Sequence, residues 1–114
     1  MIDFACKEFK LQDIVKCSLG LTKADQSVFE YLLKNQEPIQ TETLAKKLRL
    51  DLSTTQRAVK KLTEKGLLLR TQKNLRAGGY VFYYQTQDKK IIRKIIIDIV
   101  NRWTIRVEQE LNSW

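Results

Sequence analysis

The central part of the chain, residues 44–70, reads LAKKLRLDLSTTQRAVKKLTEKGLLLR. Its apolar residues recur at helical spacing in two blocks, which predicts a short helix capped by Thr41 and a longer helix after it. Ser53 and Gln56 form a capping-box pattern that predicts the start of the second helix, and Gly66 provides the left-handed residue that ends it. This part of the sequence therefore predicts two helices joined by a tight turn.

The flanking segments add a further helix and a hairpin. Upstream, Thr22 begins a helix whose apolar stripe runs from Val28 to Leu33. Downstream, residues 67–72 and 80–86 are rich in strand-forming side chains and are separated by a glycine-bearing loop, which predicts a β-hairpin. Helix, short helix, helix and hairpin in this order indicate a winged helix-turn-helix, a mainly α fold with a small β-hairpin wing.

Two more helices are predicted outside this core. Residues 3–18 show an imperfect apolar periodicity and are predicted to form a helix that Gly20 ends, while Asp88 is predicted to cap a long helix that runs to about Leu111. A chain of 114 residues fits one domain. Its expected parts are an N-terminal helix (1–20), a winged helix-turn-helix core (21–87) and a C-terminal helix (88–114).

The positive charge of the chain is concentrated in its middle. The sequence carries 21 Lys and Arg against 13 Asp and Glu, a net charge of +8. Residues 39–87 hold ten of the basic and three of the acidic residues, a net charge of +7, and no acidic residue lies between Lys65 and Gln87. A basic excess gathered in one segment favours a polyanionic partner, either nucleic acid or an anionic membrane, over an ordinary solvated surface.

Residues 44–70 resemble the signature of MarR and TrmB-like winged-helix regulators, which reads roughly LA-x-x-L, then S-T and a helix, then L-x-x-x-GL-x-x-R. The resemblance extends over about residues 22–86. It implies a transcriptional regulator of the small archaeal type that binds double-stranded DNA as a homodimer. MarR wings often carry an Asp and an Arg that tie the wing to the body, whereas the loop from Lys73 to Gly79 has no acidic residue.

The candidate DNA contacts are the polar side chains of this motif that have no place in a core. Gln56 suits a bidentate contact to adenine and Arg57 one to guanine, whereas lysines suit phosphates. A cationic wing tip can lie along the DNA backbone or enter a narrow minor groove. The predicted DNA-binding residues are Ser53, Thr54, Gln56, Arg57, Lys60 and Lys61 on the second helix, and Lys73, Asn74 and Arg76 on the wing.

The C-terminal helix carries a seam of large apolar residues at spacings of three and four, more than a helix needs to cover so small a domain. This seam predicts coiled-coil-like dimerisation, and packing against its own domain is the alternative. The acidic residues on the same helix argue against a membrane-surface helix. The predicted dimerisation residues are Ile92, Ile96, Ile99, Trp103, Val107 and Leu111.

Two other functions stay open beside sequence-specific regulation. A winged helix can serve as a protein-interaction module of the transcription machinery, and a small basic domain can coat DNA non-specifically as a chromatin protein. The basic residues of the second helix favour DNA over a protein partner. The aromatic residues of the second strand could stack on single-stranded bases, but core or dimer contacts are the preferred interpretation of Tyr80, Phe82, Tyr83 and Tyr84.

Several other classes of function find no support. The sequence has no histidine and no phosphate-binding glycine loop, so we expect no enzyme, no metal site and no cofactor, and no small-molecule effector can be named. Cys6 and Cys17 would lie about 16 Å apart on a continuous helix, too far for a disulfide, and are expected to be small buried hydrophobes. Neither a secretory leader nor a membrane-spanning stretch is expected, which predicts a cytoplasmic protein.

Overall fold

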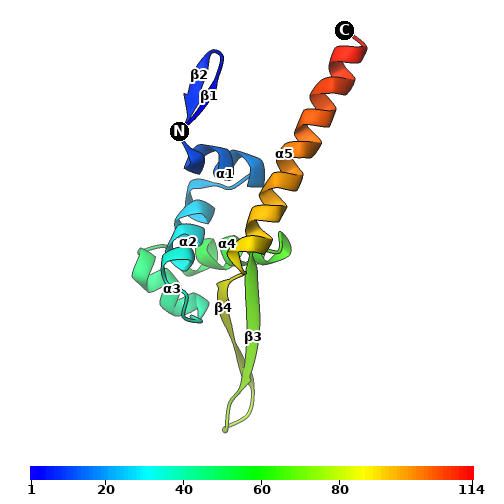
Figure 1. Ribbon diagram of the computed structural model, residues 1–114. Helices are drawn as coiled ribbons and strands as arrows, with labels where there is room; N and C mark the ends of the chain where they lie inside the picture. Colours follow the sequence, from blue (N-terminus) through cyan, green and yellow to red (C-terminus); the bar gives the residue numbers. More distant parts are fainter.

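The computed structural model describes residues 1–114 (Figure 1). α3, α4 and the β3–β4 hairpin form a winged helix-turn-helix, which confirms the predicted fold class. The wing and α5 project in opposite directions, so the molecule is elongated, with extents of 63 × 24 × 24 Å. The elements are β1 Ile2–Phe4, β2 Lys7–Phe9, α1 Leu11–Leu19, α2 Lys23–Lys34, α3 Thr41–Leu48, α4 Leu52–Glu64, β3 Leu68–Asn74, β4 Tyr80–Thr86 and α5 Lys89–Asn112.

The apolar stripes of the central helices meet in one core. α2 packs against α3 and α4, and the first residues of β3 and α5 close the remaining side. Leu32 of α2, Leu44 of α3 and Leu62 of α4 are fully buried there. Burial of one such leucine contributes about 1.5–3 kcal/mol to folding. The core therefore holds α4 by one face and leaves the opposite face in solvent.

Four predicted helix ends are confirmed by their capping geometry. Thr22 and Asp25 form a capping box, in which the Asp25 N–H donates to Thr22 Oγ1 at 3.1 Å and the Thr22 N–H donates to the Asp25 carboxylate at 2.9 Å. Asp88 caps α5 by accepting a backbone N–H at 2.9 Å. Gly20 ends α1 with a φ of 64°, and Gly66 follows α4 with a φ of 80°, a conformation that glycine adopts without strain.

The predicted caps of α3 and α4 are wrong. α4 begins at Leu52, with Asp51 in the capping position and no side-chain hydrogen bond to the helix end. Ser53 already lies within the first turn, so it forms no capping box with Gln56. Thr41 is the first residue of α3 rather than its cap. The turn after α3 is so tight that the next helix starts sooner than the serine pattern predicts.

The predicted helix over residues 3–18 is also wrong in its first half. β1 and β2 pair as an antiparallel hairpin, with Ile2 opposite Phe9 and Phe4 opposite Lys7, and only the following residues form α1. Ile2 and Phe4 alternate with a polar residue, which fits the two-residue period of a strand rather than a helical period. The N-terminal part of the chain is therefore a hairpin followed by a short helix.

The same correction applies to the cysteines. Cys6 lies in the turn between β1 and β2, whereas Cys17 lies on α1, so the two do not share a helix face. Both side chains are exposed. The expectation that they are buried hydrophobes is wrong, because Cys6 lies in a hairpin turn outside the core and Cys17 lies on the exposed side of α1.

The wing is tied to the body without an acidic residue. Ile39, in the connection between α2 and α3, exchanges two backbone hydrogen bonds with Tyr84 of β4, at 3.0 and 2.9 Å. The neighbouring Gln40 side chain donates to the Tyr83 hydroxyl at 3.2 Å. The start of α3 and the base of the wing therefore form one unit, and the farther part of the hairpin extends into solvent (Figure 1).

Candidate nucleic-acid interface

α4 presents a polar face on the side opposite the core. Gln56, Arg57 and Lys60 are exposed along this face, and Ser53 is exposed in the first turn. Thr54 is half-buried, and its hydroxyl lies 3.5 Å from the Arg57 guanidinium. Because these three long polar side chains are not part of the core, they can contact a partner without disturbing the fold. The buried face of the same helix consists of Thr55, Ala58, Val59 and Leu62.

Lys61 is not part of this polar face. Its ammonium group donates to an Asp25 carboxylate oxygen at 2.8 Å, in the only salt bridge of the chain, and to the Gly20 carbonyl oxygen at 2.6 Å. One side chain of α4 thereby contacts the end of α1 and the start of α2. The structure brings Lys60 together with Gln56 and Arg57, but it holds Lys61 in a contact that joins three helices.

The environment of Asp25 is reflected in its pKa. Burial alone would raise the pKa, because it disfavours the charged carboxylate. The hydrogen bonds from Lys61 and from the backbone and hydroxyl of Thr22, together with the positive charge of Lys61, outweigh burial and lower the pKa of Asp25 below its ordinary value of 3.8. The carboxylate is therefore charged at neutral pH and holds α4 against α1 and α2.

The wing carries the predicted cations near its tip. Lys73 and Asn74 are the last residues of β3, and Arg76 lies in the turn that follows. All three side chains are exposed. They lie far from the helical core at one end of the molecule (Figure 1). The structure therefore places the predicted wing residues on a separate arm, at a distance from the polar face of α4.

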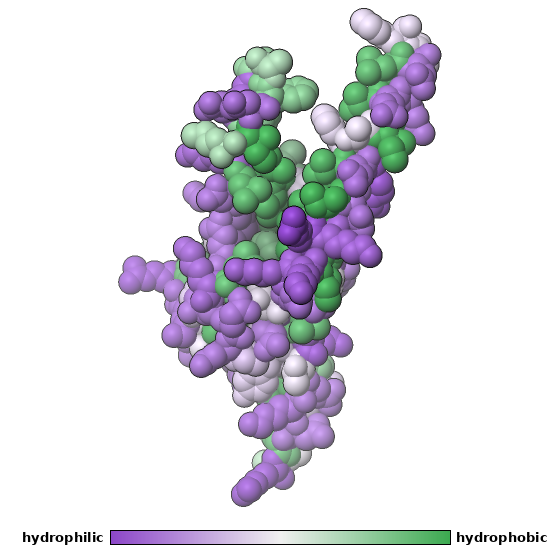
Figure 2. Space-filling model, viewed as in Figure 1, coloured by the Kyte–Doolittle hydropathy of each residue, from purple (hydrophilic) through white to green (hydrophobic).

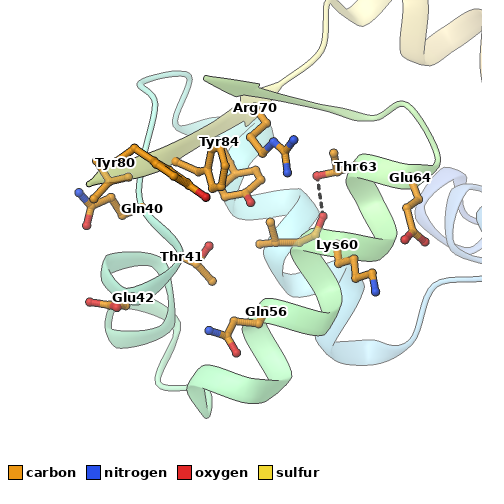
Figure 3. Close-up of a pocket in the computed structure, with 13 residues that line it drawn as sticks. Gln40, Thr41, Glu42, Gln56, Lys60, Thr63, Glu64, Arg70, Tyr80 and Tyr84 are labelled. Carbon is orange, nitrogen blue, oxygen red and sulfur yellow. Dashed lines mark hydrogen bonds between the residues drawn. The ribbon is translucent and has the colours of Figure 1, made fainter. Parts of the chain in front are cut away.

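A groove separates α4 from the wing. It has a volume of about 600 Å³ and is lined by Gln56 and Lys60 of α4, by Gln40 and Thr41 at the start of α3, and by β3 and β4 of the wing. Figure 3 shows the side chains of α3, α4 and the wing that line this groove, with Arg70 extending from the wing toward α4. The polar face of α4 is thus one wall of a groove rather than an isolated surface.

Arg70 lies in this groove, and the predicted set of contacts did not include it. Its guanidinium carbon lies 4.3 Å from the centre of the Phe82 ring, in a cation–π contact. Phe82 in turn packs against Tyr80 in an edge-to-face arrangement, with ring centres 5.2 Å apart. Strand alternation alone could have placed Arg70 on one face of β3. Its proximity to Phe82 depends on the hairpin register, which pairs Arg70 with Tyr84.

The predicted dimerisation seam divides into two parts along α5. Ile92 is buried in the chain's own core, and Ile96 and Ile99 pack against it. Trp103, Val107 and Leu111 lie beyond the body and are 60%, 36% and 56% exposed. Hydrophobic surface covers much of this projecting part of α5 and of the N-terminal hairpin, whereas the wing half of the molecule is largely hydrophilic (Figure 2).

Comparison with known proteins identifies the family. The MarR family profile matches residues 31–76. A protein of Methanosarcina mazei Go1, described as a possible transcriptional regulator, is 53% identical, with 100% of this chain and 96% of that chain covered and a TM-score of 0.92. The chain belongs to the MarR family. This is a family of transcriptional regulators and not of enzymes, in agreement with the prediction from sequence.

Two further relatives of this MarR-family chain are informative. An uncharacterized protein of Methanocaldococcus jannaschii, MJ1503, is 32% identical over 92% of this chain and 84% of its own length. A MepR variant of S. aureus, bound to an oligodeoxyribonucleotide, shares the fold at 19% identity and a TM-score of 0.57, with 90% of this chain and 71% of that chain covered. None of the helices in the structure has the length and apolar character needed to cross a membrane.

Proposed function

We propose that the chain is a transcriptional regulator that binds specific sites in double-stranded DNA as a homodimer. The observation that carries the proposal is the exposed polar face of α4 beside a cationic wing. In a winged helix-turn-helix, the helix in the position of α4 enters the major groove with its N-terminal residues at the base edges. Gln56 and Arg57 occupy that part of α4 and have the hydrogen-bonding groups that recognise adenine and guanine.

The remaining predicted contacts have positioning roles in this proposal. Ser53 and Thr54, in the first turn of α4, lie where hydroxyls and free backbone N–H groups can approach a phosphate. Lys60 extends the same face toward the DNA backbone, and the wing cations Lys73 and Arg76, with Asn74 between them, contact the backbone or minor groove farther along the duplex. Lys61 is left out, because its ammonium group is already paired with Asp25.

The projecting half of α5 supports the proposed dimer. Every residue from 101 to 114 is exposed, although Trp103, Val107 and Leu111 line one side of the helix. A monomer would leave these large side chains in water, and a second copy related by a two-fold axis would cover them. In this arrangement residues 21–87 bind DNA and residues 88–114 hold the two subunits at a fixed separation, with α1 of the N-terminal segment 1–20 packed beside α5.

The relatives support a place among small archaeal regulators of the MarR/TrmB-like type. The Methanosarcina and Methanocaldococcus proteins match this chain over most of its length. A regulator of this kind would act in the cytoplasm, where the chromosomal DNA lies.

Selection of bound sites from a random pool of duplex DNA tests the proposal. We expect a near-palindromic site whose half-sites are about one helical turn apart, the spacing that two symmetric winged helices require. The selected site should bind far more tightly than a shuffled sequence of the same composition. Equal binding to both would indicate a non-specific chromatin protein. No binding to either would leave a protein-interaction module as the function.

A further inference from the structure

We infer that the groove between α4 and the wing binds one sugar-phosphate strand of the duplex, and that Arg70 is the main phosphate ligand within it. The inference rests on the proposed function and adds Arg70, the last residue of the quoted signature, to the DNA contacts predicted from the sequence. It depends on the position of the groove, on the contacts that orient Arg70, and on the charges around it.

The position of the groove follows from the shape of DNA. The major and minor grooves of a duplex are separated by a sugar-phosphate backbone. If α4 lies in the major groove and the wing reaches the adjacent minor groove, the strand that separates these grooves must pass between the two elements. The space between them is the groove of about 600 Å³ that Gln56 and Lys60 line on one side and Arg70 and Phe82 on the other.

The wing orients Arg70 toward this space. In the register of the hairpin, Arg70 lies opposite Tyr84 and Gln72 lies opposite Phe82, so Arg70 and Phe82 are diagonal neighbours on one face of the sheet. The guanidinium lies over the Phe82 ring. Tyr80, two residues before Phe82 on the same face of β4, also contacts that ring. Figure 3 shows Arg70 extending from the wing toward α4. The aromatic side chains therefore form a support that restricts the guanidinium before any ligand binds.

Arg70 is also free to bind an anion. It makes no salt bridge and no side-chain hydrogen bond within the chain, whereas Lys61 is fully engaged with Asp25 and Gly20. Stacking on a ring occupies the face of a guanidinium and leaves its N–H edge free to donate two hydrogen bonds to a phosphate. A cation oriented in this way loses less side-chain entropy on binding than a freely rotating one.

The acidic residues limit where a phosphate can lie. Glu42 on α3 and Glu64 at the end of α4 also line the groove, and Figure 3 shows them at opposite ends of it. Their carboxylates repel a phosphate at either end, while Lys60 and Arg70 attract one between them. The groove therefore fits a single stretch of backbone in its middle and not an extended run of phosphates.

Binding assays on the Arg70→Ala variant at several salt concentrations test the inference. We expect roughly tenfold weaker binding to both the selected site and random duplex, and a slope of log K against log salt that is smaller by about one. Lys23→Ala, which removes an exposed cation of α2 outside the groove, should leave both quantities unchanged. Arg70→Lys should keep the slope but lose part of the affinity, as should Phe82→Leu, because the charge remains and its orientation is lost.

A second measurement separates direct contact from a structural effect. Neutral methylphosphonate groups are placed singly along each strand of the selected site. One position should weaken binding by the wild-type protein and have no effect on the Arg70→Ala variant. If the wild-type protein binds DNA with steep salt dependence while Arg70→Ala and Arg70→Lys bind identically to it, the inference is overturned and the proposed function stands. If the wild-type protein binds no DNA, the proposed function itself fails.

Discussion

Lys60 and Lys61 adjoin in the sequence but have different surroundings. Successive residues of a helix point in directions about 100° apart, so Lys60 lines the groove beside the wing and Lys61 faces the body. The sequence identifies both as polar residues of α4 and gives no means to distinguish them. The partners of Lys61 lie 36 and 41 positions upstream, and only the packing of three helices brings them together.

Arg57 tests whether α4 reads bases. Arg57→Ala should weaken binding to the selected site by about 1–3 kcal/mol and relax the preference at one base pair of each half-site, because a bidentate contact to guanine is lost. Binding to random duplex should change much less. The measurement is a set of dissociation constants for the selected site, its single-base variants and random DNA. Equal losses on all of them would show that Arg57 contacts only phosphate.

Asp25 tests the contact that joins α1, α2 and α4. Asp25→Asn should lower the free energy of unfolding at pH 7 by about 1–3 kcal/mol, since it removes the ion pair with Lys61 and weakens the capping box. Because the pKa of Asp25 is lower in the folded than in the unfolded state, its contribution is complete at neutral pH and disappears as the pH falls through the folded-state value.

Denaturant unfolding between pH 7 and pH 2 measures this difference. The wild-type protein and Asp25→Asn should converge in stability at the acidic end, below the ordinary carboxyl pKa of 3.8. Asp98→Asn, which changes an exposed carboxylate on α5, is the matched control and should follow the wild type throughout. A stability difference that stays constant down to the lowest pH would contradict the role given to the Asp25 charge.

The hairpins show which elements the sequence determines. β4 occupies residues 80–86, as predicted, because seven consecutive residues rich in aromatic and β-branched side chains give a clear strand signal. β1 and β2 have three residues each, too few to establish a two-residue period against the helical signal of α1 next to them. The groove beside the wing depends on the register between β3 and β4, which residue pattern alone does not give.

The tip of the wing can be tested as a unit. Replacing Lys73 and Arg76 together by Gln should weaken binding to the selected site and to random duplex by similar factors and reduce the salt slope by up to about two, because two phosphate contacts are lost. The side chains are exposed, so the fold should be unaffected. Dissociation constants at several salt concentrations check this, with Lys23→Ala as the control. An unchanged slope would show that the wing tip does not approach the duplex.

The C-terminal seam has two different surroundings along one helix. A single helical period runs from Ile92 to Leu111, yet the first part packs on the chain's own core and the second part extends beyond it. Both predicted uses of the helix, packing on its own domain and dimerisation, rest on the same spacing of apolar residues. The length of α5 relative to the body, which only the fold reveals, determines which of these residues pack on the chain's own core and which stay exposed (Figure 1).

Truncation after Val100 tests the dimer. This cut keeps the core residue Ile92 and the half-buried Ile96 and Ile99 but removes Trp103, Val107 and Leu111, so the winged core should still fold. Covering the exposed part of one Trp side chain contributes about 3 kcal/mol per subunit, and two-fold symmetry counts each residue twice. The intact chain should therefore sediment at micromolar concentration as a dimer of about twice 13.4 kDa, and the truncated chain as a monomer.

The loss of assembly should be visible in DNA binding as well. Two linked winged helices bind a palindrome far more tightly than either alone, because the second contact becomes intramolecular. The truncated chain should lose most of its affinity for the full palindrome and bind it about as weakly as a single half-site. Trp103→Ala should shift the monomer–dimer equilibrium in the same direction without removing any DNA contact. An intact chain that sediments as a monomer of 13.4 kDa and still binds the palindrome tightly would refute the two-fold model.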